Sequence, residues 1–388
     1  MAKKVIIGIN YGSGHDSSAA IIADGKLIAI GEEERFTRKK HDNLFPYKSI
    51  EFCLSEAGVK PEEVTHACIG WDKWTHFGKK LLFAFGGLKT ASVWRRLKFI
   101  RILVVMAMEA EAKMRQIFPN AKIYSVEHHM AHASSTYYTS DFDESAIISW
   151  DGRGEWSTGF LAIAKGNNIK KLKETYYPVS YGMLYTAFTH YLGFDSNDEY
   201  KVMGLSAYGK PIMKDKVKSI VRFSDKNVVD IDLSYFQHPG FSFKTGWGEK
   251  YFTEKLEQEL GPARRHWEPI NDRYEDVAAS LQQCYNEIGV EVAKYLSKQT
   301  NCKNLCITGG VGLNGVMNMA IMKNSGFKDF HFISAPDDAG VGLGAALWVH
   351  HVILGNTKRI KLDTPYWGIS FSNEFIRKEI ENYRYRNV

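Results

Sequence analysis

Two histidines four residues apart are the side chains of this sequence most suited to chemistry. His128 and His132 lie in the run HHMAHASS, so on a helix they project from one face about one turn apart. Two imidazoles in this arrangement can bind one metal ion. The same spacing also arises by chance among ordinary surface or core histidines, so the interpretation depends on further ligands elsewhere in the chain.

Two aspartates are candidates for these further ligands. Asp151 ends the apolar run 146–150, and Asp338 follows the apolar run 330–335. Open α/β sheets bind ligands at the carboxyl ends of their strands, so we expect both carboxylates in one crevice with the histidine pair. Two His with one or two Asp suit iron, manganese or zinc. Each aspartate is equally consistent with a helix cap or a turn.

A glycine-rich turn indicates a nucleotide site. The run GGVGLN follows the apolar run 304–308 and precedes a helical pattern, where backbone amides and the helix dipole favour phosphate. A second turn of this kind follows the next strand and contains three more glycines. A nucleotide is the ligand that two adjacent turns with bare backbone favour, and we expect it to contact Gly309, Gly310, Val311, Asn314 and Gly340.

A polar turn near the N-terminus holds His15, Asp16 and Ser17. A histidine at a turn beside hydroxyl groups can bind a phosphate or act as a base near neutral pH. An Asp-Ser pair that only stabilises the turn is an equally good interpretation.

The elements that must position these residues form a duplicated pattern. Residues 4–30 and 145–172 each contain an apolar strand, a polar turn and a returning hairpin. Between residues 274 and 354, helical and strand patterns alternate, which predicts an α/β domain with a largely parallel sheet. We therefore expect the duplicated α/β fold of the actin, sugar-kinase and Hsp70 ATPase superfamily, with a cleft between two lobes.

Composition limits the class of protein. Of 388 residues, 44% are hydrophobic and 24% are charged, the balance of a folded globular chain. Five scattered cysteines without a CxxC pair predict buried free thiols in a reducing compartment rather than a zinc ribbon. The N-terminal run MAKKVIIGIN lacks the features of a secretory signal, so we expect a cytoplasmic protein.

The positive charge is concentrated in one segment. Lys79 to Arg115 contains nine Lys or Arg and two Glu, a net charge of +7, whereas the whole chain carries +6. Nucleic acid is therefore not an expected partner. The segment mixes cations with large apolar residues. It fits either an amphipathic helix on anionic lipid, peripheral at the inner membrane face, or a packed helix whose charged face is solvated.

Six motifs in a fixed order carry a resemblance to a known family. They are the N-terminal run with HDSSAAIIADGKLIAIGEEERFTRKKHDNLFP, then HHMAHASS, WDGRGE, EYKVMGLSAYGKP, GGVGLN and DDAGVGLGAA. Over most of residues 5–350 the chain resembles the O-carbamoyltransferases of nodulation-factor, cephamycin and aminoglycoside biosynthesis, the NodU/CmcH family.

The resemblance implies a metal-bearing domain related to the tRNA threonylcarbamoyl-adenosine enzyme, which passes a carbamoyl group from carbamoyl adenylate to a hydroxyl. Iron is the metal expected first, with zinc or manganese as alternatives, and Mg²⁺ serves the adenylating step that uses ATP and carbamoyl phosphate. His128, His132 and Asp338 match the family's metal ligands, and Asp151 matches the second carboxylate. His15 is our first candidate for the base. The expected catalytic residues are His15, Asp16 and Asp151.

Matched motifs also suggest residues that contact substrate, although solvated surface charge is an equally good interpretation of the charged ones. These residues are Ser17, Glu34, Arg35, Glu199 and Lys201. Two small departures from the family pattern are Gly312 and the Ser206-Ala207 pair. A third concerns Asp337-Asp338, which lacks the glycine usually placed before the ligand, and Asp338 is our choice because Asp-x-Gly then aligns.

We expect four segments in the domain organisation. They are a first lobe over 1–140, a second lobe over 141–360, an insertion or lid over about 210–272 that shapes the acceptor pocket, and the start of a linker or second domain over 361–388. The resemblance implies that the second domain is YrdC-like and performs the first half-reaction, in cis or in trans.

The resemblance implies an acceptor with a free hydroxyl, for which a sugar, an antibiotic scaffold and a glycolipid are the options, and exposed aromatic patches suggest a homodimer. The alternatives are a sugar-kinase-like phosphotransferase and a non-catalytic nucleotide-binding partner subunit.

Overall fold

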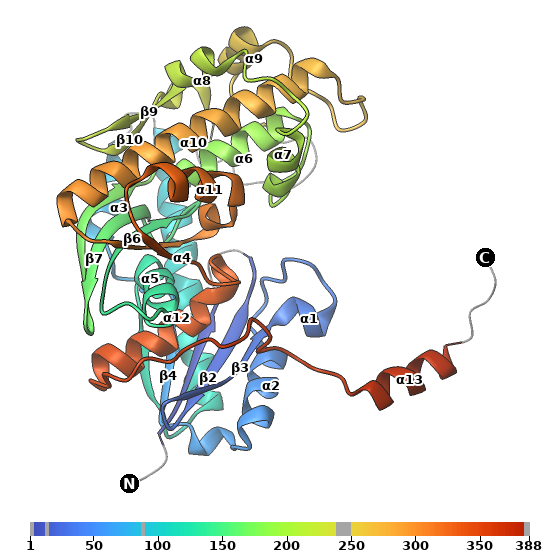
Figure 1. Ribbon diagram of the computed structural model, residues 1–388. Coiled ribbons are helices and arrows are strands. Elements are labelled where there is room, and N and C mark those ends of the chain that lie inside the picture. Colours follow the sequence, from blue (N-terminus) through green and yellow to red (C-terminus); the bar gives the residue numbers. More distant parts are fainter. Residues whose placement is uncertain (1–3, 12–14, 87–89, 238–249, 384–388) are drawn as a thin grey trace.

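The computed structural model describes residues 4–11, 15–86, 90–237 and 250–383. The first of its two large sheets has five strands in the order β3-β2-β1-β4-β5 (Figure 1). Strands β1, β2 and β3 are antiparallel, whereas β4 and β5 run parallel to β1. These strands are β1 Val5–Asn10, β2 Ser18–Ala23, β3 Lys26–Glu32, β4 His66–Ile69 and β5 Lys122–Ser125.

The second large sheet repeats this arrangement strand for strand. Its order is β8-β7-β6-β11-β12, with an antiparallel β6-β7-β8 unit followed by two parallel strands. The strands are β6 Glu144–Trp150, β7 Ser157–Lys165, β8 Asn168–Tyr176, β11 Asn304–Thr308 and β12 Asp329–His331. This repeat confirms the predicted duplicated α/β fold of the actin, sugar-kinase and Hsp70 ATPase type.

Two helices lie between the sheets (Figure 1). Helix α5 (His128–Tyr137) packs against β6 and β11 of the second sheet, and α12 (Val341–Trp348) packs against β1 and β2 of the first. The two helices also pack against each other. The chain thus passes from the second sheet back to the first just before α12. The segment around residue 338 therefore lies beside the start of α5, around residue 128.

Glycines in the DDAGVGLGAA run permit this close packing. A Cβ added to Gly344 would lie 1.8 Å from the Ala131 carbonyl oxygen of α5, and one added to Gly8 would lie 2.2 Å from the Gly342 carbonyl oxygen. Gly340, Gly342 and Gly344 therefore face protein backbone. Helix and sheet packing thus uses the space beside these three residues, and contact of Gly340 with a nucleotide stays a prediction.

Replacing Gly344 by alanine tests this packing. We expect Gly344→Ala to lower the free energy of unfolding by about 3 kcal/mol, because backbone atoms cannot move aside as a flexible side chain can. Gly204→Ala in α7 (Glu199–Leu205) is the matched control, since its added Cβ meets nothing within 4 Å and alanine favours helix. Chemical denaturation of both variants measures the difference, and equal stabilities would contradict the packing argument.

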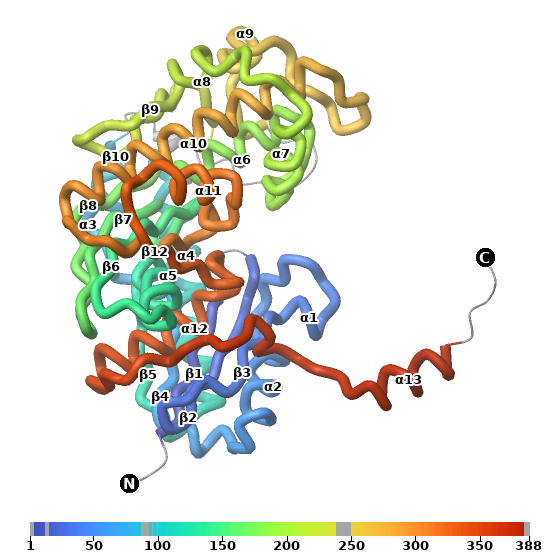
Figure 2. The backbone as a smooth tube through the Cα atoms, viewed as in Figure 1, coloured from blue at the N-terminus to red at the C-terminus, as the bar shows by residue number. Residues whose placement is uncertain are grey.

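Other helices surround the two sheets, some packed on strands and some only on neighbouring helices. In the first half these are α1 Glu33–Thr37, α2 Tyr47–Ala57, α3 Phe77–Phe85 and α4 Thr90–Ile117. In the second half they are α6 Tyr181–Tyr191, α7 Glu199–Leu205, α10 Asp272–Thr300 and α11 Gly315–Asn324. After α12 the chain crosses the first sheet, where the Trp367 carbonyl accepts from the Ile30 amide. Helix α13 (Asn373–Asn382) then stands apart from both lobes (Figure 2).

Most predicted elements agree with the structure, and three boundaries differ. The helix expected from residue 313 begins at Gly315, after a 3-10 turn over Gly310–Leu313. The strand expected over 330–335 ends at His331, because β12 is an edge strand that pairs with β11 through three residues. The helix expected over 340–354 changes to π geometry at Val349–Ile353.

The segment 210–272 is more regular than an irregular insertion, as far as the structure describes it. It contains α8 Lys214–Ile220, β9 Val221–Ser224, β10 Val228–Ile231 and α9 Glu254–Leu260, and residues 238–249 lie outside the described part. Val217, Ile220 and Leu256 join the hydrophobic core of the second lobe. The division of the chain into lobes at residue 140 stays a prediction.

All five cysteines are free and buried, as predicted from their scattered positions. Among the helices that the structure describes, none has the length and apolar character needed to cross a bilayer.

Candidate functional site

Four buried side chains converge at the carboxyl ends of the central strands. One nitrogen of His128, one of His132, and one oxygen each of Asp151 and Asp338 all lie within 4.8 Å of one another. The Nε2 atoms of the two histidines are 3.0 Å apart. His128 Nε2 lies 3.2 Å from Asp151 Oδ2 and 3.2 Å from Asp338 Oδ1. The structure thus brings together all four predicted metal ligands.

Three different elements position these four groups. Both histidines lie on one face in the first two turns of α5, as their spacing predicted. Asp151 follows β6, and Asp338 begins the short turn that leads into α12. Because α5 and α12 pack against each other between the sheets, the ends of these elements meet.

Charge within the cluster favours a cation. Burial lowers the pKa of His128, but the carboxylates of Asp338 and Asp151 outweigh it and raise that pKa well above its usual value. Burial raises the pKa of Asp151, but His128 and His132 outweigh this effect and hold that pKa well below the usual range. Two buried carboxylates need compensating positive charge, and two imidazoles with two carboxylates are a suitable donor set for a divalent transition metal.

Glu155 is buried directly beneath the start of α5. Its Oε1 accepts from the amide of His128 at 2.9 Å and from that of Asp72 at 2.7 Å. Its Oε2 has no hydrogen-bond partner among the described residues. Burial raises the pKa of the Glu155 carboxyl to about 7. Glu155 thus holds the N-terminus of the helix that carries the histidine pair.

Removing this acceptor is expected to destabilise the protein. Glu155→Ala leaves two largely buried N–H groups without a partner, so the free energy of unfolding should fall by about 2 to 4 kcal/mol. Glu155→Gln is the matched control, because the amide oxygen can take the place of Oε1 and keep both bonds. Chemical denaturation measures both variants, and an equally large loss in the glutamine variant would show that the negative charge matters more than the hydrogen bonds.

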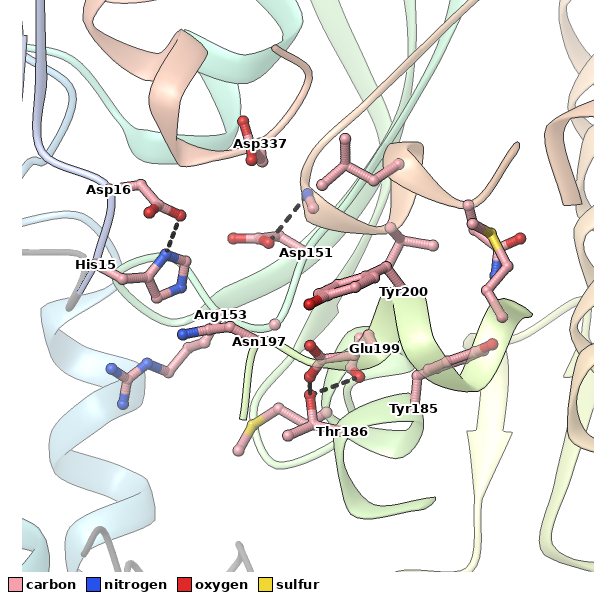
Figure 3. A pocket seen from close by; sticks show the side chains of 18 of the residues that line it. His15, Asp16, Asp151, Arg153, Tyr185, Thr186, Asn197, Glu199, Tyr200 and Asp337 are labelled. Carbon is pink, nitrogen blue, oxygen red and sulfur yellow. Dashed lines mark hydrogen bonds and ion pairs between the residues drawn. The ribbon is translucent and has the colours of Figure 1, made fainter. Parts of the chain in front are cut away.

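A pocket of about 330 Å³ opens beside the cluster (Figure 3). Asp151 belongs to both the pocket wall and the cluster. Helix α6, helix α7 with the residue Asn197 before it, and the 3-10 turn after β11 supply most of the other walls. Predicted site residues in the lining are His15, Asp16, Asp151, Glu199, Gly310, Val311 and Asn314. None of the described residues of 210–272 lines this pocket, and the role of that segment as a lid stays a prediction.

His15 joins a chain of hydrogen bonds at the pocket edge. Its Nδ1 lies 2.8 Å from Asp16 Oδ2 and 3.9 Å from Asp338 Oδ2, while Asp16 Oδ1 lies 2.8 Å from His41 Nδ1. Burial acts to lower the pKa of His15, but Asp338 and Asp16 outweigh it and raise that pKa to about 10. His15 therefore lies at the edge of the cluster, and its role as a base stays a prediction.

The glycine-rich turn differs from the phosphate cradle that its sequence predicted. The amides of Gly309 and Gly312 donate to carbonyl oxygens of the protein, and the Gly310 amide donates to Asp151 Oδ1 at 3.1 Å. The Asn314 side chain caps α11 and contacts Gln282. The turn therefore fixes Asp151 and forms one wall of the pocket, with Gly309 behind that wall.

The five residues expected to contact substrate separate into two groups. Glu199 lines the pocket, accepts from Thr186 Oγ1 at 2.6 Å, and has a pKa raised by burial. The others lie outside the lining. Ser17 is buried, Glu34 Oε2 accepts from the His41 amide, Arg35 pairs with Glu32, and Lys201 pairs with Asp198.

Sequence reasoning missed several lining residues and the supporting Glu155. Arg153 and Glu155 belong to the motif WDGRGE, and His41 belongs to RFTRKKHD, so position within a motif was the signal available. Tyr185, Asn197 and Tyr285 also line the pocket, and nothing in the sequence marked them.

The fold and this cluster define a class of α/β proteins with a metal-type site beside a cleft pocket. Residues 5–347 match the family described as "Carbamoyltransferase N-terminus". The chain therefore belongs to the carbamoyltransferase family, which confirms the resemblance seen in its motifs.

Relatives of this chain are longer than the chain itself. An uncharacterized protein of Synechocystis is 34% identical over 95% of this chain and 61% of its own length. Nodulation protein NolNO of Sinorhizobium fredii is 30% identical over 91% of this chain and 49% of its own length. The chain thus spans about half to three fifths of the length of these relatives.

Solved structures with some likeness to the chain include full-length HypF in a phosphate- and nucleotide-bound form. It is 13% identical, covers 91% of this chain and 47% of its own, and has a TM-score of 0.48. The ROK hexokinase from Thermus thermophilus is 12% identical, covers 91% and 100%, and has a TM-score of 0.44.

Proposed function

We propose that the chain performs the transfer step of an ATP-dependent O-carbamoyltransferase. A carbamoyl group would pass from carbamoyl adenylate to a hydroxyl of a small-molecule or glycan acceptor. The bond between the carbamoyl carbon and the phosphate oxygen breaks, a bond from that carbon to the acceptor oxygen forms, and AMP and a proton leave. Family membership supports the reaction class.

One observation carries the proposal, namely the convergence of four ligand atoms within 4.8 Å beside the pocket. His128, His132, Asp151 and Asp338 would hold a divalent ion, for which iron is our first choice. Such an ion supplies Lewis acidity toward a carbamoyl or phosphate oxygen. A sugar-kinase-like phosphotransferase gives no role to the two histidines.

The residues of the pocket would divide the remaining tasks. The wall formed by Gly310, Val311 and Leu313 offers backbone and apolar surface to the adenosine, and Arg153 offers positive charge to its phosphate. His15 lies next to the cluster and would hold or accept the proton of the acceptor hydroxyl. Without a cation at the cluster, the carboxylates of Asp338 and Asp16 raise the pKa of His15, and this favours its protonated form. Positive charge at the cluster would lower that pKa toward the range of a base.

The first half-reaction, which uses carbamoyl phosphate and ATP with Mg²⁺, would belong to a YrdC-like domain in the part of the relatives that this chain does not match. The acceptor hydroxyl would enter beside Glu199 and Tyr200. A homodimer and a place in the cytoplasm remain expectations from the sequence.

The direct test supplies carbamoyl adenylate to the metal-loaded chain with a panel of sugars, aminoglycosides and glycolipids. We expect release of AMP that depends on the acceptor, with mass spectrometry showing the acceptor gaining one carbamate. AMP release that no acceptor accelerates, in a chain that has retained its metal, would favour the non-catalytic partner subunit instead.

A further inference from the structure

Helix α4 carries apolar side chains on two opposite faces. Leu103, Ala107, Ala110 and Met114 are at most 5% exposed and belong to the hydrophobic core under the first sheet. Their spacing of four, three and four residues defines one helical face. This face accounts for the folding of α4 and leaves the opposite face free.

The opposite face of α4 is unlike that of an ordinary packed helix. Exposed positions alternate at intervals of four and three residues, so they form one stripe along the helix. We call these residues the outer stripe: Trp94, Lys98, Arg101, Ile102, Val105 and Met108. Four of the six are large apolar residues, with exposures of 74% for Trp94, 44% for Ile102, 40% for Val105 and 55% for Met108. The sequence also allowed a packed helix whose outer face is charged and solvated. The outer face of α4 is instead mostly apolar.

Helix α3 extends the exposed apolar surface at the turn between the two helices. Leu82 is 75% exposed and Phe85 is 63% exposed. Arg96 of α4 holds the hairpin together, because its Nη1 donates to the Phe83 carbonyl at 2.8 Å and its guanidinium lies 4.3 Å from the Phe83 ring. The two helices therefore form one packed unit, and each of them exposes large apolar side chains.

Up to Met108 the charge of this hairpin is entirely positive, and Glu109 and Glu111 follow nearer the end of α4. Between Asp72 and Glu109 the sequence contains eight Lys or Arg and no Asp or Glu. Lys98 and Arg101 place two of these cations within the outer stripe, between Trp94 and Val105. Large apolar residues with Lys and Arg and without acids are the composition of helices that lie in the interface of anionic bilayers. Tryptophan is also enriched at that depth.

We propose that the α3–α4 hairpin docks on a membrane surface rich in anionic lipid through the outer stripe. The apolar side chains would enter the headgroup region, and Lys98 and Arg101 would contact lipid phosphates. The hairpin would lie on the bilayer, in keeping with the absence of a spanning helix among those described. This surface is separate from the metal cluster and pocket, so the proposal stands independently of the proposed transfer reaction.

Vesicle flotation tests the proposal on the whole chain. We expect binding to vesicles of mixed phosphatidylcholine and phosphatidylglycerol at low salt, much weaker binding at high salt, and little binding to phosphatidylcholine alone. Absence of binding to the anionic vesicles at low salt would overturn the proposal.

Two pairs of variants separate the apolar and ionic contributions. Trp94→Ser with Met108→Ser should weaken anionic-vesicle binding roughly tenfold or more, since each removes a large apolar side chain from the bilayer contact. Lys98→Gln with Arg101→Gln should weaken binding at low salt and reduce its salt dependence. Because these side chains are exposed, the melting temperature should stay unchanged.

The matched control replaces two equally exposed apolar residues of the second half, Tyr208→Ser with Ile212→Ser, whose side chains are 77% and 71% exposed. We expect vesicle binding of this control to equal that of the unaltered chain. An equal loss in the control would overturn the assignment to the outer stripe. A second result would also overturn the assignment: the unaltered chain is a dimer, the stripe variants are monomers, and vesicle binding persists in those variants. The outer stripe would then be a subunit interface.

Discussion

Replacing His128 by alanine is expected to lower carbamoyl transfer at least about a hundredfold and to release the metal. Lewis-acid assistance contributes several kcal/mol, and each 1.4 kcal/mol or so corresponds to about tenfold in rate. His128 Nε2 is the atom nearest to all three other ligands, at 3.0, 3.2 and 3.2 Å, so its removal opens the cluster at its centre. Metal content and transfer rate are measured on the same preparation.

The control for this variant is His266→Ala, which removes an exposed histidine of the second half outside the pocket. We expect it to keep both metal and activity. His132→Ala should behave as His128→Ala does, because both imidazoles face the same two carboxylates. If the His128 variant kept full activity while binding no metal, the proposed role of the cluster would be wrong.

The fold was predictable because its signals are local and occur twice. Strand-turn-strand patterns at 4–30 and 145–172 became β1 to β3 and β6 to β8. The Asp24-Gly25 turn has the positive φ values of 47° and 76° that a two-residue hairpin turn requires. The sequence could not predict that α12 packs on the first sheet, because an apolar helix can cover either of two apolar sheets equally well.

The site was predictable where a residue type carries the chemistry. Two histidines at helical spacing and two aspartates after strands allow few interpretations, and the four side chains do converge. Glycines carry less information, because a bare backbone serves a ligand or a neighbouring helix equally well. The bare backbone of Gly340 and Gly344 faces Ala335 and Ala131, a packing role that their residue type alone does not distinguish from a ligand contact.

Distant segments of the chain explain the residues that sequence reasoning missed. Glu155 matters because its carboxylate meets the amides of His128 and Asp72. Tyr185, Asn197 and Tyr285 line the pocket because α6, α7 and α10 meet near it. Glu155 lies within the motif WDGRGE, whereas nothing in the sequence marks the three pocket residues, so only the folded arrangement identifies them.

Neutralising Asp338 should release the metal, whereas neutralising its neighbour Asp337 should not. Asp338 Oδ1 lies 3.2 Å from His128 Nε2 and 3.4 Å from His132 Nε2. Asp338→Asn removes the negative charge at this point, so we expect metal affinity to fall at least about a hundredfold, more than the loss of an outer-shell partner causes. The ambiguity that the sequence left between the two aspartates is thereby tested directly.

Asp337→Asn is the matched variant one residue away. Burial, with the nearby carboxylates of Asp16 and Asp338, raises the pKa of Asp337 to about 7. Its charge therefore opposes its neighbours near neutral pH, and an asparagine there removes repulsion without removing a ligand. Competition with a chromophoric chelator gives the metal affinity of each variant without reference to activity. Retention of metal by Asp338→Asn together with its loss from Asp337→Asn would assign the ligand to Asp337.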